Sequence, residues 1–172
     1  MVHLITGGAG CGKSEYAEQQ ILSLGEDRNR IYIATMIPGG DPENLERIRR
    51  HRERRSSMGF QTIECPKDLG QVELPENSAV LLEDIPNLLA NALFMPNGSG
   101  IHAGSMILSG FRRLVSEARD VIAVTDDVFC DGCEYQDSTK LYMQLLGLIS
   151  QDIVCEADHV TEVVYGIPVV LK

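Results

Sequence analysis

The sequence predicts one α/β domain in which a mostly parallel sheet is flanked by helices and ends in a C-terminal β-hairpin. Short apolar runs alternate with amphipathic segments along the chain, which is the pattern of doubly wound sheets. A glycine-rich loop joins the first apolar run to the first amphipathic segment. The length of 172 residues, of which 44% are hydrophobic, suits one core. We therefore expect residues 1–172 to form a single domain.

The first elements surround the glycine-rich loop. Residues 2–6 form a short β-type run, and the glycines of residues 7–12 interrupt it. A helix is expected at residues 13–24, because apolar side chains recur there at helical spacing. Residues 30–35, with the sequence RIYIAT, predict a second buried strand.

A basic helix and two further strands come after this strand. Asp41 as N-cap and Pro42 at the first helical position predict the start of an arginine-rich helix, which residues 56–59 end. Residues 61–65 are expected to form a strand. After a polar connection, the continuous apolar run at residues 79–85 predicts a strand that is buried on both faces.

The C-terminal half continues the alternation. Helices are expected at residues 86–94 and 105–119, and a strand at residues 121–125. A long helix should end near Ala157, and the last two β-type runs surround Gly166, which predicts the terminal hairpin. In such a sheet, ligands bind at the carboxyl ends of the strands, and the polar motifs of this sequence fall at those ends.

The glycine-rich loop matches the P-loop pattern G-x-x-x-x-G-K-[ST]. Its residues are Gly7, Gly8, Ala9, Gly10, Cys11, Gly12, Lys13 and Ser14. Backbone N–H groups of the loop and the helix N-terminus can bind phosphate oxygens, and Lys13 can reach the β- and γ-phosphates as a catalytic residue. A glycine-rich turn with an incidental lysine is the alternative. The order of strand, loop and helix favours a P-loop nucleotide-binding fold.

A P-loop enzyme also needs an acid that anchors Mg²⁺, normally at the end of an apolar strand beside the P-loop strand. The run from Val80 to Asp84 ends such a strand. We expect Glu83 to be catalytic there and to hold the metal together with Ser14. A solvated acid that caps the helix starting at Pro86 is the other interpretation.

The basic helix carries a local excess of positive charge. From Arg47 to Arg55 there are six arginines and one glutamate, so this stretch carries +5 and leaves −15 for the rest of the chain. His51 lies four residues from both Arg47 and Arg55, so the three side chains share one helix face. The arginines could bind a polyphosphate and disfavour imidazolium, which would let a neutral His51 attack an α-phosphate. Spacing alone favours a solvated basic helix with an uninvolved histidine.

Charge and cysteine content limit the partners and the compartment. With 15 Lys and Arg against 25 Asp and Glu, the net charge of −10 argues against nucleic acid or an anionic membrane as a partner. We see neither a signal peptide nor a membrane-length apolar run. Five cysteines fit free thiols in a reducing compartment, so a cytoplasmic protein is expected. Cys130 and Cys133 have the spacing of a metal or redox pair, but no second Cys/His pair occurs after them.

Together these motifs resemble the bifunctional adenosylcobinamide kinase / adenosylcobinamide-phosphate guanylyltransferase family of cobalamin biosynthesis. The likeness is carried by the P-loop, the RIYIAT run, R-I-x-x-H-R-x-x-R followed by Thr62-x-Glu64, and the tail ADHVTEVVYGIPVVLK. It implies phosphorylation of adenosylcobinamide by ATP or GTP, and then transfer of GMP from GTP. It implies that His51 takes up GMP covalently, that Mg²⁺ serves both reactions, and that Arg47, Arg55 and Glu64 bind nucleotide. It also implies a homo-oligomer, with a trimer as one candidate.

One segment departs from the family pattern. Family members usually carry an S-N-E-V-G-x-G-I-V-P-like segment after the fifth strand, whereas residues 125–134 read TDDVFCDGCE. An alignment without gaps places Asp126 and Asp127 on the N-E pair. Two other functions therefore stay open. One is a P-loop kinase of another small alcohol that uses His51 only electrostatically, and the other is a non-catalytic, nucleotide-binding regulatory homologue.

Overall fold

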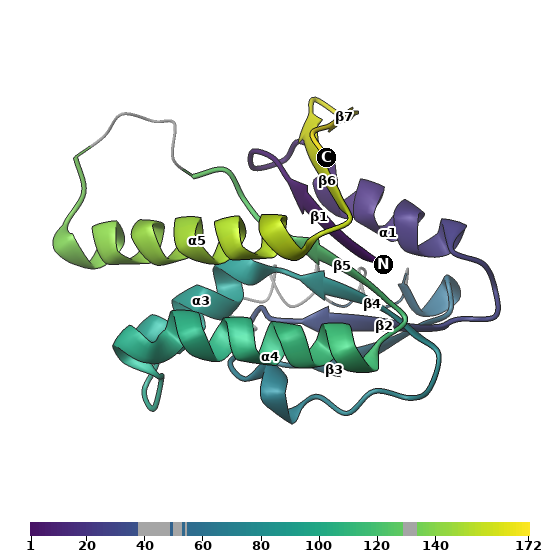
Figure 1. The fold of residues 1–172 in the computed structure, drawn as a ribbon, viewed down its shortest axis with the longest axis horizontal. Helices are drawn as coiled ribbons and strands as arrows, with labels where there is room; N and C mark the ends of the chain where they lie inside the picture. The colour runs from purple at the N-terminus through teal and green to yellow at the C-terminus, as the bar shows by residue number, and fades with distance from the viewer. Residues whose placement is uncertain (38–48, 50–52, 54, 129–133) are drawn as a thin grey trace.

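A computed structural model describes residues 1–37, 49, 53, 55–128 and 134–172 (Figure 1). Within these ranges, one seven-stranded sheet has the strand order β3-β2-β4-β5-β1-β6-β7. The strands are β1 (Val2–Thr6), β2 (Asn29–Ala34), β3 (Phe60–Glu64), β4 (Ser78–Glu83), β5 (Asp120–Val124), β6 (His159–Val164) and β7 (Ile167–Val170).

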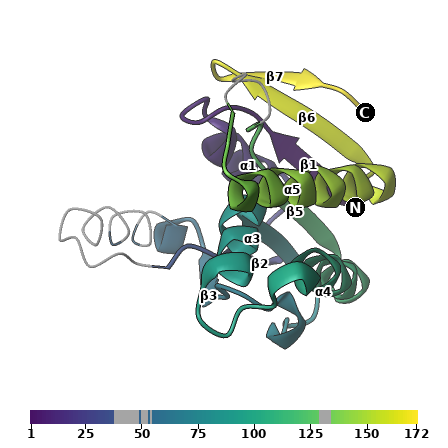
Figure 2. The same ribbon diagram turned by 90° about the vertical axis from the view of Figure 1, so that its left-hand side faces the viewer.

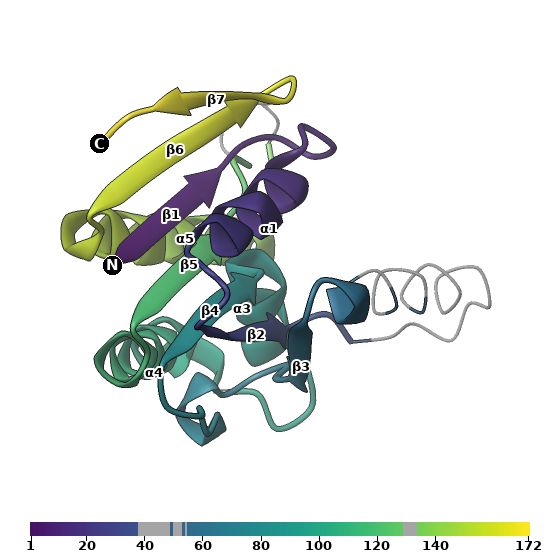
Figure 3. The same ribbon diagram turned by 90° about the vertical axis from the view of Figure 1, so that its right-hand side faces the viewer.

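Helices cover both faces of this sheet (Figures 2 and 3). One face packs against α1 (Lys13–Ser23), and the other packs against α3 (Ile85–Phe94), α4 (Ala103–Glu117) and α5 (Asp137–Glu156). Two 3-10 turns, η1 (Leu69–Gln71) and η2 (Gly100–His102), lie in connections. Across the described ranges, no helix has the length and apolar content that a membrane crossing needs.

The sheet confirms the predicted fold class. Every described pair of neighbouring strands is parallel except β6 and β7, which pair antiparallel as the expected terminal hairpin. Tyr165 and Gly166 form its turn with φ angles of +50° and +80°. Because the other strands run in one direction, their carboxyl ends share one edge of the sheet. The loops that could bind a ligand are gathered along that edge.

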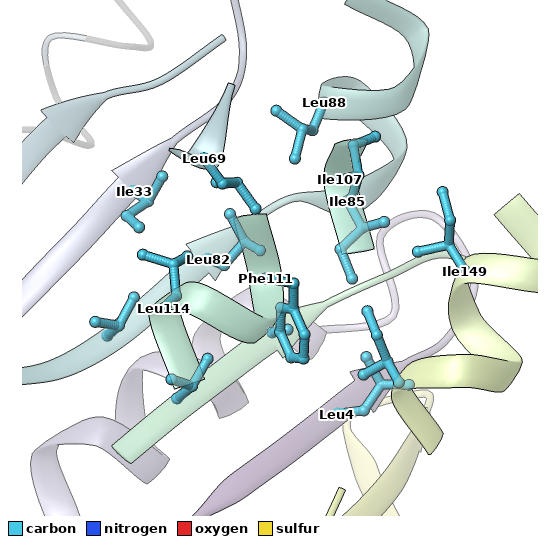
Figure 4. Close-up of a cluster of buried hydrophobic side chains, with 14 of the residues drawn as sticks. Leu4, Ile33, Leu69, Leu82, Ile85, Leu88, Ile107, Phe111, Leu114 and Ile149 are labelled. Carbon is cyan, nitrogen blue, oxygen red and sulfur yellow. The ribbon is translucent and has the colours of Figure 1, made fainter. Parts of the chain in front are cut away.

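The core has two parts, one on each side of the sheet. The larger part fills the space between the sheet and α3, α4 and α5 (Figure 4). In β4, Val80 and Leu82 point into this part, whereas Ala79 and Leu81 point toward α1. All four side chains are fully buried. This double burial explains why β4 is a continuous apolar run rather than an alternating one.

Most element boundaries agree with the sequence within two residues, and the differences have local causes. The apolar run at 79–85 is divided, because Asp84 becomes the N-cap of α3 and its side chain accepts a hydrogen bond from the Asn87 backbone N–H at 2.7 Å. The connection expected to be polar contains η1, in which Leu69 is buried. Of the basic helix, residues 49, 53 and 55–57 are described and are helical; its predicted start at Asp41 lies outside the described residues.

The packing of α4 on η1 depends on Gly110. A Cβ at this position would lie 2.7 Å from Leu69 Cβ and 3.1 Å from the Gly70 backbone nitrogen. We expect Gly110→Ala to lower the free energy of unfolding by about 1–3 kcal/mol, although alanine is the better helix former. Urea unfolding would measure this change in the free energy of unfolding. Gly104→Ala in the same helix, whose Cβ would meet Leu145 Cδ2 at 3.4 Å, is the control and should be neutral or stabilising. Equal stability of the two variants would contradict the prediction.

Candidate active site

The P-loop runs from the end of β1 to the start of α1. Gly10 and Gly12 have φ angles of +69° and +93°, which lie in the region that favours glycine. A Cβ on Gly8 or Gly10 would meet no described atom within 4 Å, so the loop is open on that side. On the other side, a Cβ on Gly7 would lie 2.5 Å from the Val163 carbonyl oxygen in β6. The loop is thus packed at its base and open where a phosphate cradle must be open.

Two distant segments hold this loop in place. The Gly166 N–H, in the turn of the C-terminal hairpin, donates a hydrogen bond of 2.8 Å to the Cys11 carbonyl. The Asp127 N–H, after β5, donates one of 3.3 Å to the Gly7 carbonyl. The shape of the P-loop therefore depends on residues far along the chain as well as on its own glycines.

Lys13 is buried at the first position of α1, with 9% of its surface exposed. Its Nζ donates to the Gly8 carbonyl at 3.1 Å and lies 2.7 Å from Asp126 Oδ1. The motif predicted the place of the lysine in the loop but not the carboxylate that it contacts. Asp126 was not among the candidate site residues predicted from the sequence, although it contacts Lys13. The acidic pair directly after a buried strand was the signal that could have identified it.

The position of Glu83 corrects one expectation. We expected its strand beside the P-loop strand, but β5 lies between β1 and β4. Glu83 still belongs to the site, because α1 contacts β4 as well as β5 and brings Ser14 to the Glu83 carboxylate. Burial raises the pKa of the Glu83 carboxyl, and the hydrogen bond from the Ser14 hydroxyl opposes this effect. Glu83 Oε2 is buried and has no hydrogen-bond partner among the described residues.

Further acids lie near Glu83 and Lys13. Burial raises the pKa of the Asp84 carboxyl, the hydrogen bond from the Asn87 N–H opposes this, and the negative charge of Asp126 adds to the rise. The hydroxyl of Tyr142 on α5 lies near these acids. Burial and the negative charges of Asp84 and Asp126 raise its pKa to about 12. The negative charges of Asp84 and Asp126 therefore act on each other's surroundings at this edge of the sheet.

The predicted nucleotide-binding residues of the basic stretch are described only in part. Arg47 and His51 lie outside the described residues. Arg55 is 7% exposed, and its guanidinium carbon lies 3.6 Å from the centre of the Tyr32 ring. Glu64 ends β3, at the edge of the sheet far from β1, and is exposed. The structure thus brings Lys13, Ser14 and Glu83 together, with Arg55 close to Glu83. Glu64 also lies at the carboxyl end of its strand, but three strands separate β3 from β1.

Metal ligation by cysteine or histidine has no support in the described residues. No group of three or more His, Cys, Asp or Glu side chains there is placed to hold a metal ion. Cys11, Cys65 and Cys155 are free thiols. Cys130 and Cys133, which have the spacing of a metal or redox pair, lie outside the described residues. A Mg²⁺ ion does not need such a group, since it is usually bound through one or two protein oxygens together with substrate phosphates and water.

Comparison with solved structures supports the fold. The crystal structure of the flagellar accessory protein FlaH from Methanocaldococcus jannaschii matches 99% of this chain and 77% of that chain, with a TM-score of 0.56 and 14% identity. A KaiC-like protein from Pyrococcus horikoshii OT3 matches 94% of this chain and 71% of that chain, with a TM-score of 0.52 and 14% identity. At these identities the likeness shows the fold alone.

Comparison of sequences identifies a protein family, whereas comparison of structures identified only the fold. The curated protein named "Bifunctional adenosylcobalamin biosynthesis protein CobU" from Salmonella typhimurium (strain LT2) is 30% identical over 186 positions, and its namesake from Escherichia coli (strain K12) is 28% identical over 189. Both alignments cover 100% of both chains. A sequence model described as cobinamide kinase / cobinamide phosphate guanyltransferase matches residues 3–171. With a match that leaves out only the terminal residues, this chain belongs to the cobinamide kinase / cobinamide phosphate guanyltransferase family.

Proposed function

We propose that this protein is a bifunctional enzyme of adenosylcobalamin biosynthesis. It phosphorylates adenosylcobinamide with a nucleoside triphosphate and then transfers GMP from GTP to adenosylcobinamide phosphate. The family match over residues 3–171 is the observation that carries the proposal, and the names of both relatives agree with it. A kinase of another alcohol and a non-catalytic homologue are less favoured, because the match covers the basic stretch and the tail as well as the P-loop.

In the first reaction, the P-loop holds and neutralises the phosphates. Its backbone N–H groups and the N-terminus of α1 bind the phosphate oxygens, and Lys13 neutralises charge on the β- and γ-phosphates. The hydroxyl oxygen of the substrate forms a bond to the γ-phosphorus while the bond to the β,γ-bridging oxygen breaks. The nucleoside diphosphate leaves with that electron pair. Positioning and charge neutralisation supply most of the acceleration.

Ser14 and Glu83 would hold Mg²⁺. The fit rests on the buried Glu83 Oε2, which has no hydrogen-bond partner in the described part of the chain, and on the Ser14 hydroxyl beside the same carboxylate. When bound, Mg²⁺ neutralises charge on the phosphate oxygens.

The second reaction is assigned to the basic stretch. His51 would attack the α-phosphorus of GTP and release pyrophosphate, which leaves a phosphoramidate. A phosphate oxygen of the substrate would then bond to that phosphorus while the bond to the His51 nitrogen breaks, so that GMP is transferred and the imidazole is released. Arg47 and Glu64 would bind the nucleotide, whereas the guanidinium of Arg55, which the sequence pattern grouped with them, lies over the Tyr32 ring. These roles rest on the R-I-x-x-H-R-x-x-R pattern and on family membership.

The same proposal covers other properties of the protein. Residues 1–172 form one domain, the substrates are nucleotides and corrinoids, and the protein is a homo-oligomer in the cytoplasm. The five cysteines support the choice of compartment, and the net charge of −10 argues against a nucleic-acid partner.

One experiment tests the proposal directly. The protein is incubated with adenosylcobinamide and ATP, and separately with GTP labelled at the α-phosphate. The expected results are adenosylcobinamide phosphate in the first reaction and acid-labile label on the protein in the second. Product without label would refute the role of His51 and keep the first reaction. Absence of both product and label would favour the kinase of another alcohol or the non-catalytic homologue.

Two substitutions should separate the activities. Lys13→Ala removes the ammonium from the terminal phosphates, so phosphorylation should fall by about 100-fold or more while the fold is kept. His51→Ala should abolish GMP labelling and GMP transfer but keep phosphorylation, because the first reaction uses the P-loop. Paired assays of both reactions on both variants make the comparison. Full labelling of His51→Ala, or normal phosphorylation by Lys13→Ala, would refute the corresponding role.

The ion pair between Lys13 and Asp126 should weaken nucleotide binding. The phosphate of the incoming nucleotide replaces Asp126 as the partner of the Lys13 ammonium. The Asp126 carboxylate then lies beside the negative charge of that phosphate. Asp126→Asn is expected to lower the Kd of a nucleoside triphosphate several-fold, since such a pair is worth about 1 kcal/mol. Titration with a fluorescent analogue would measure the change. Asp137→Asn, which removes the same charge at the exposed start of α5, should leave the Kd unchanged. Weaker binding by Asp126→Asn would show instead that its carboxylate supports the bound nucleotide.

A further inference from the structure

A group of polar side chains is enclosed between α1 and the sheet, next to the P-loop. We call it the Glu83 cluster; its members are Ser14, Glu18, Tyr32, Arg55 and Glu83. Glu18, Tyr32 and Arg55 are 4%, 6% and 7% exposed. Buried polar groups in such numbers need a specific arrangement, because each one loses its hydration on folding.

The strand register brings Tyr32 and Glu83 to the same face of the sheet. In the parallel pair of β2 and β4, Tyr32 lies opposite Leu81 and Ala34 lies opposite Glu83. Alternate residues of a strand share a face, and both Tyr32 and Leu81 belong to the core on the α1 side. The same register brings the Tyr32 hydroxyl near the Glu83 carboxylate, whose negative charge adds to the effect of burial in raising the pKa of that hydroxyl. Ser14 is the second hydroxyl near this carboxylate.

The Tyr32 ring is fixed from two directions. The Arg55 guanidinium lies over its face, with Cζ at 3.6 Å from the ring centre. The Phe60 ring meets it edge to face, with the centres 6.4 Å apart and the planes at 87°. A ring held in this way can direct its hydroxyl in one direction only.

Arg55 also supplies charge to the cluster. Glu18 and Glu83 are both close enough to affect the Tyr32 hydroxyl, and Glu18 also acts on Glu83. The negative charge of Glu18 adds to the rise of the Glu83 pKa that burial causes, and the positive charge of Arg55 opposes it. The guanidinium Nε has no hydrogen-bond partner in the described ranges, so the aromatic ring is an important part of what holds it there.

We propose that Arg55 and Tyr32 are positioning residues for Glu83: Arg55 fixes the Tyr32 ring, and the Tyr32 hydroxyl fixes the carboxylate so that Oε2 is left for the metal ion. This inference rests on the proposed function, in which Glu83 holds Mg²⁺. It gives Arg55 a role different from direct phosphate binding. It also connects the basic stretch to the acid of the first reaction, because Arg55 is the last arginine of that stretch.

Tyr32→Phe and Arg55→Lys test this role with small changes. The first removes one hydroxyl and keeps the ring; the second keeps the charge and removes the planar group that stacks. Tyr16→Phe and Arg30→Lys are the matched controls. Tyr16 packs edge-on against His3, and the Arg30 guanidinium donates to backbone carbonyls of Met58 and Gly25.

The measurement is the Kd of a fluorescent, non-hydrolysable nucleoside triphosphate, first in EDTA and then across a Mg²⁺ titration. In EDTA, the Kd of both test variants should stay within about twofold of the unmodified protein. In the titration, both should need about 10-fold more Mg²⁺ to reach half of the increase in nucleotide affinity that Mg²⁺ produces, as is usual when a partner of a metal ligand is lost. The kcat of phosphorylation should fall about as much, with little change in KM. Both controls should match the unmodified protein.

Two results would overturn the proposal. Unchanged Mg²⁺ dependence in both variants would show that Glu83 needs no such support, and a weaker Kd in EDTA would show that the side chains contact phosphate directly. If melting curves show that Arg55→Lys is unfolded, Tyr32→Phe alone decides. Because the binding assay contains no corrinoid, it stands apart from the proposed function. A protein that binds nucleotide with Mg²⁺ dependence but does not phosphorylate adenosylcobinamide would refute the function and still test the positioning role.

Discussion

The parallel pairing of β1 with β5 on one side and β6 on the other is the constraint on which the site depends. The register sets Ile5 opposite Val124 and Thr6 opposite Glu162, so β1 and β5 end at nearly the same level and β6 ends only a few residues beyond them. The segments after these strands therefore meet at one edge: the P-loop after β1, Asp126 after β5 and the hairpin turn after β6. No side chain of the site could produce this arrangement, since it comes from the backbone ladder and the apolar contacts on both faces of the strands.

Most of the helices and strands could be predicted because their signals are local. Apolar periodicity and turn residues identified nearly every element, and the P-loop could be recognised because its glycines and Lys13 are adjacent in the chain. Strand order is not local. Nothing in the apolar run of β4 shows that β5 separates it from β1, so the partner of Lys13 was missed and the strand of Glu83 was placed one position too close.

Arg55 shows a second limit of sequence patterns. Helical spacing grouped it with Arg47 and His51, which describes the helix by itself. Its burial against Tyr32 depends on what the sheet places beneath the helix, and this information lies in β2, more than twenty residues earlier in the chain. Leu69 in η1 was missed for a similar reason, because single apolar residues in a polar connection have no period to detect.

The contact between the C-terminal hairpin and the P-loop has a consequence for how the protein is made. The glycine-rich loop is synthesised about 150 residues before its packing partner Val163 and its hydrogen-bond donor Gly166. A ribosome that has released the chain as far as β4 has released β1 without either of its neighbouring strands, because β5 and β6 come later. The first strand therefore stays unpaired in the sheet until β5 emerges, and the glycine-rich loop gains its packing partner and its hydrogen-bond donor only when β6 and β7 follow.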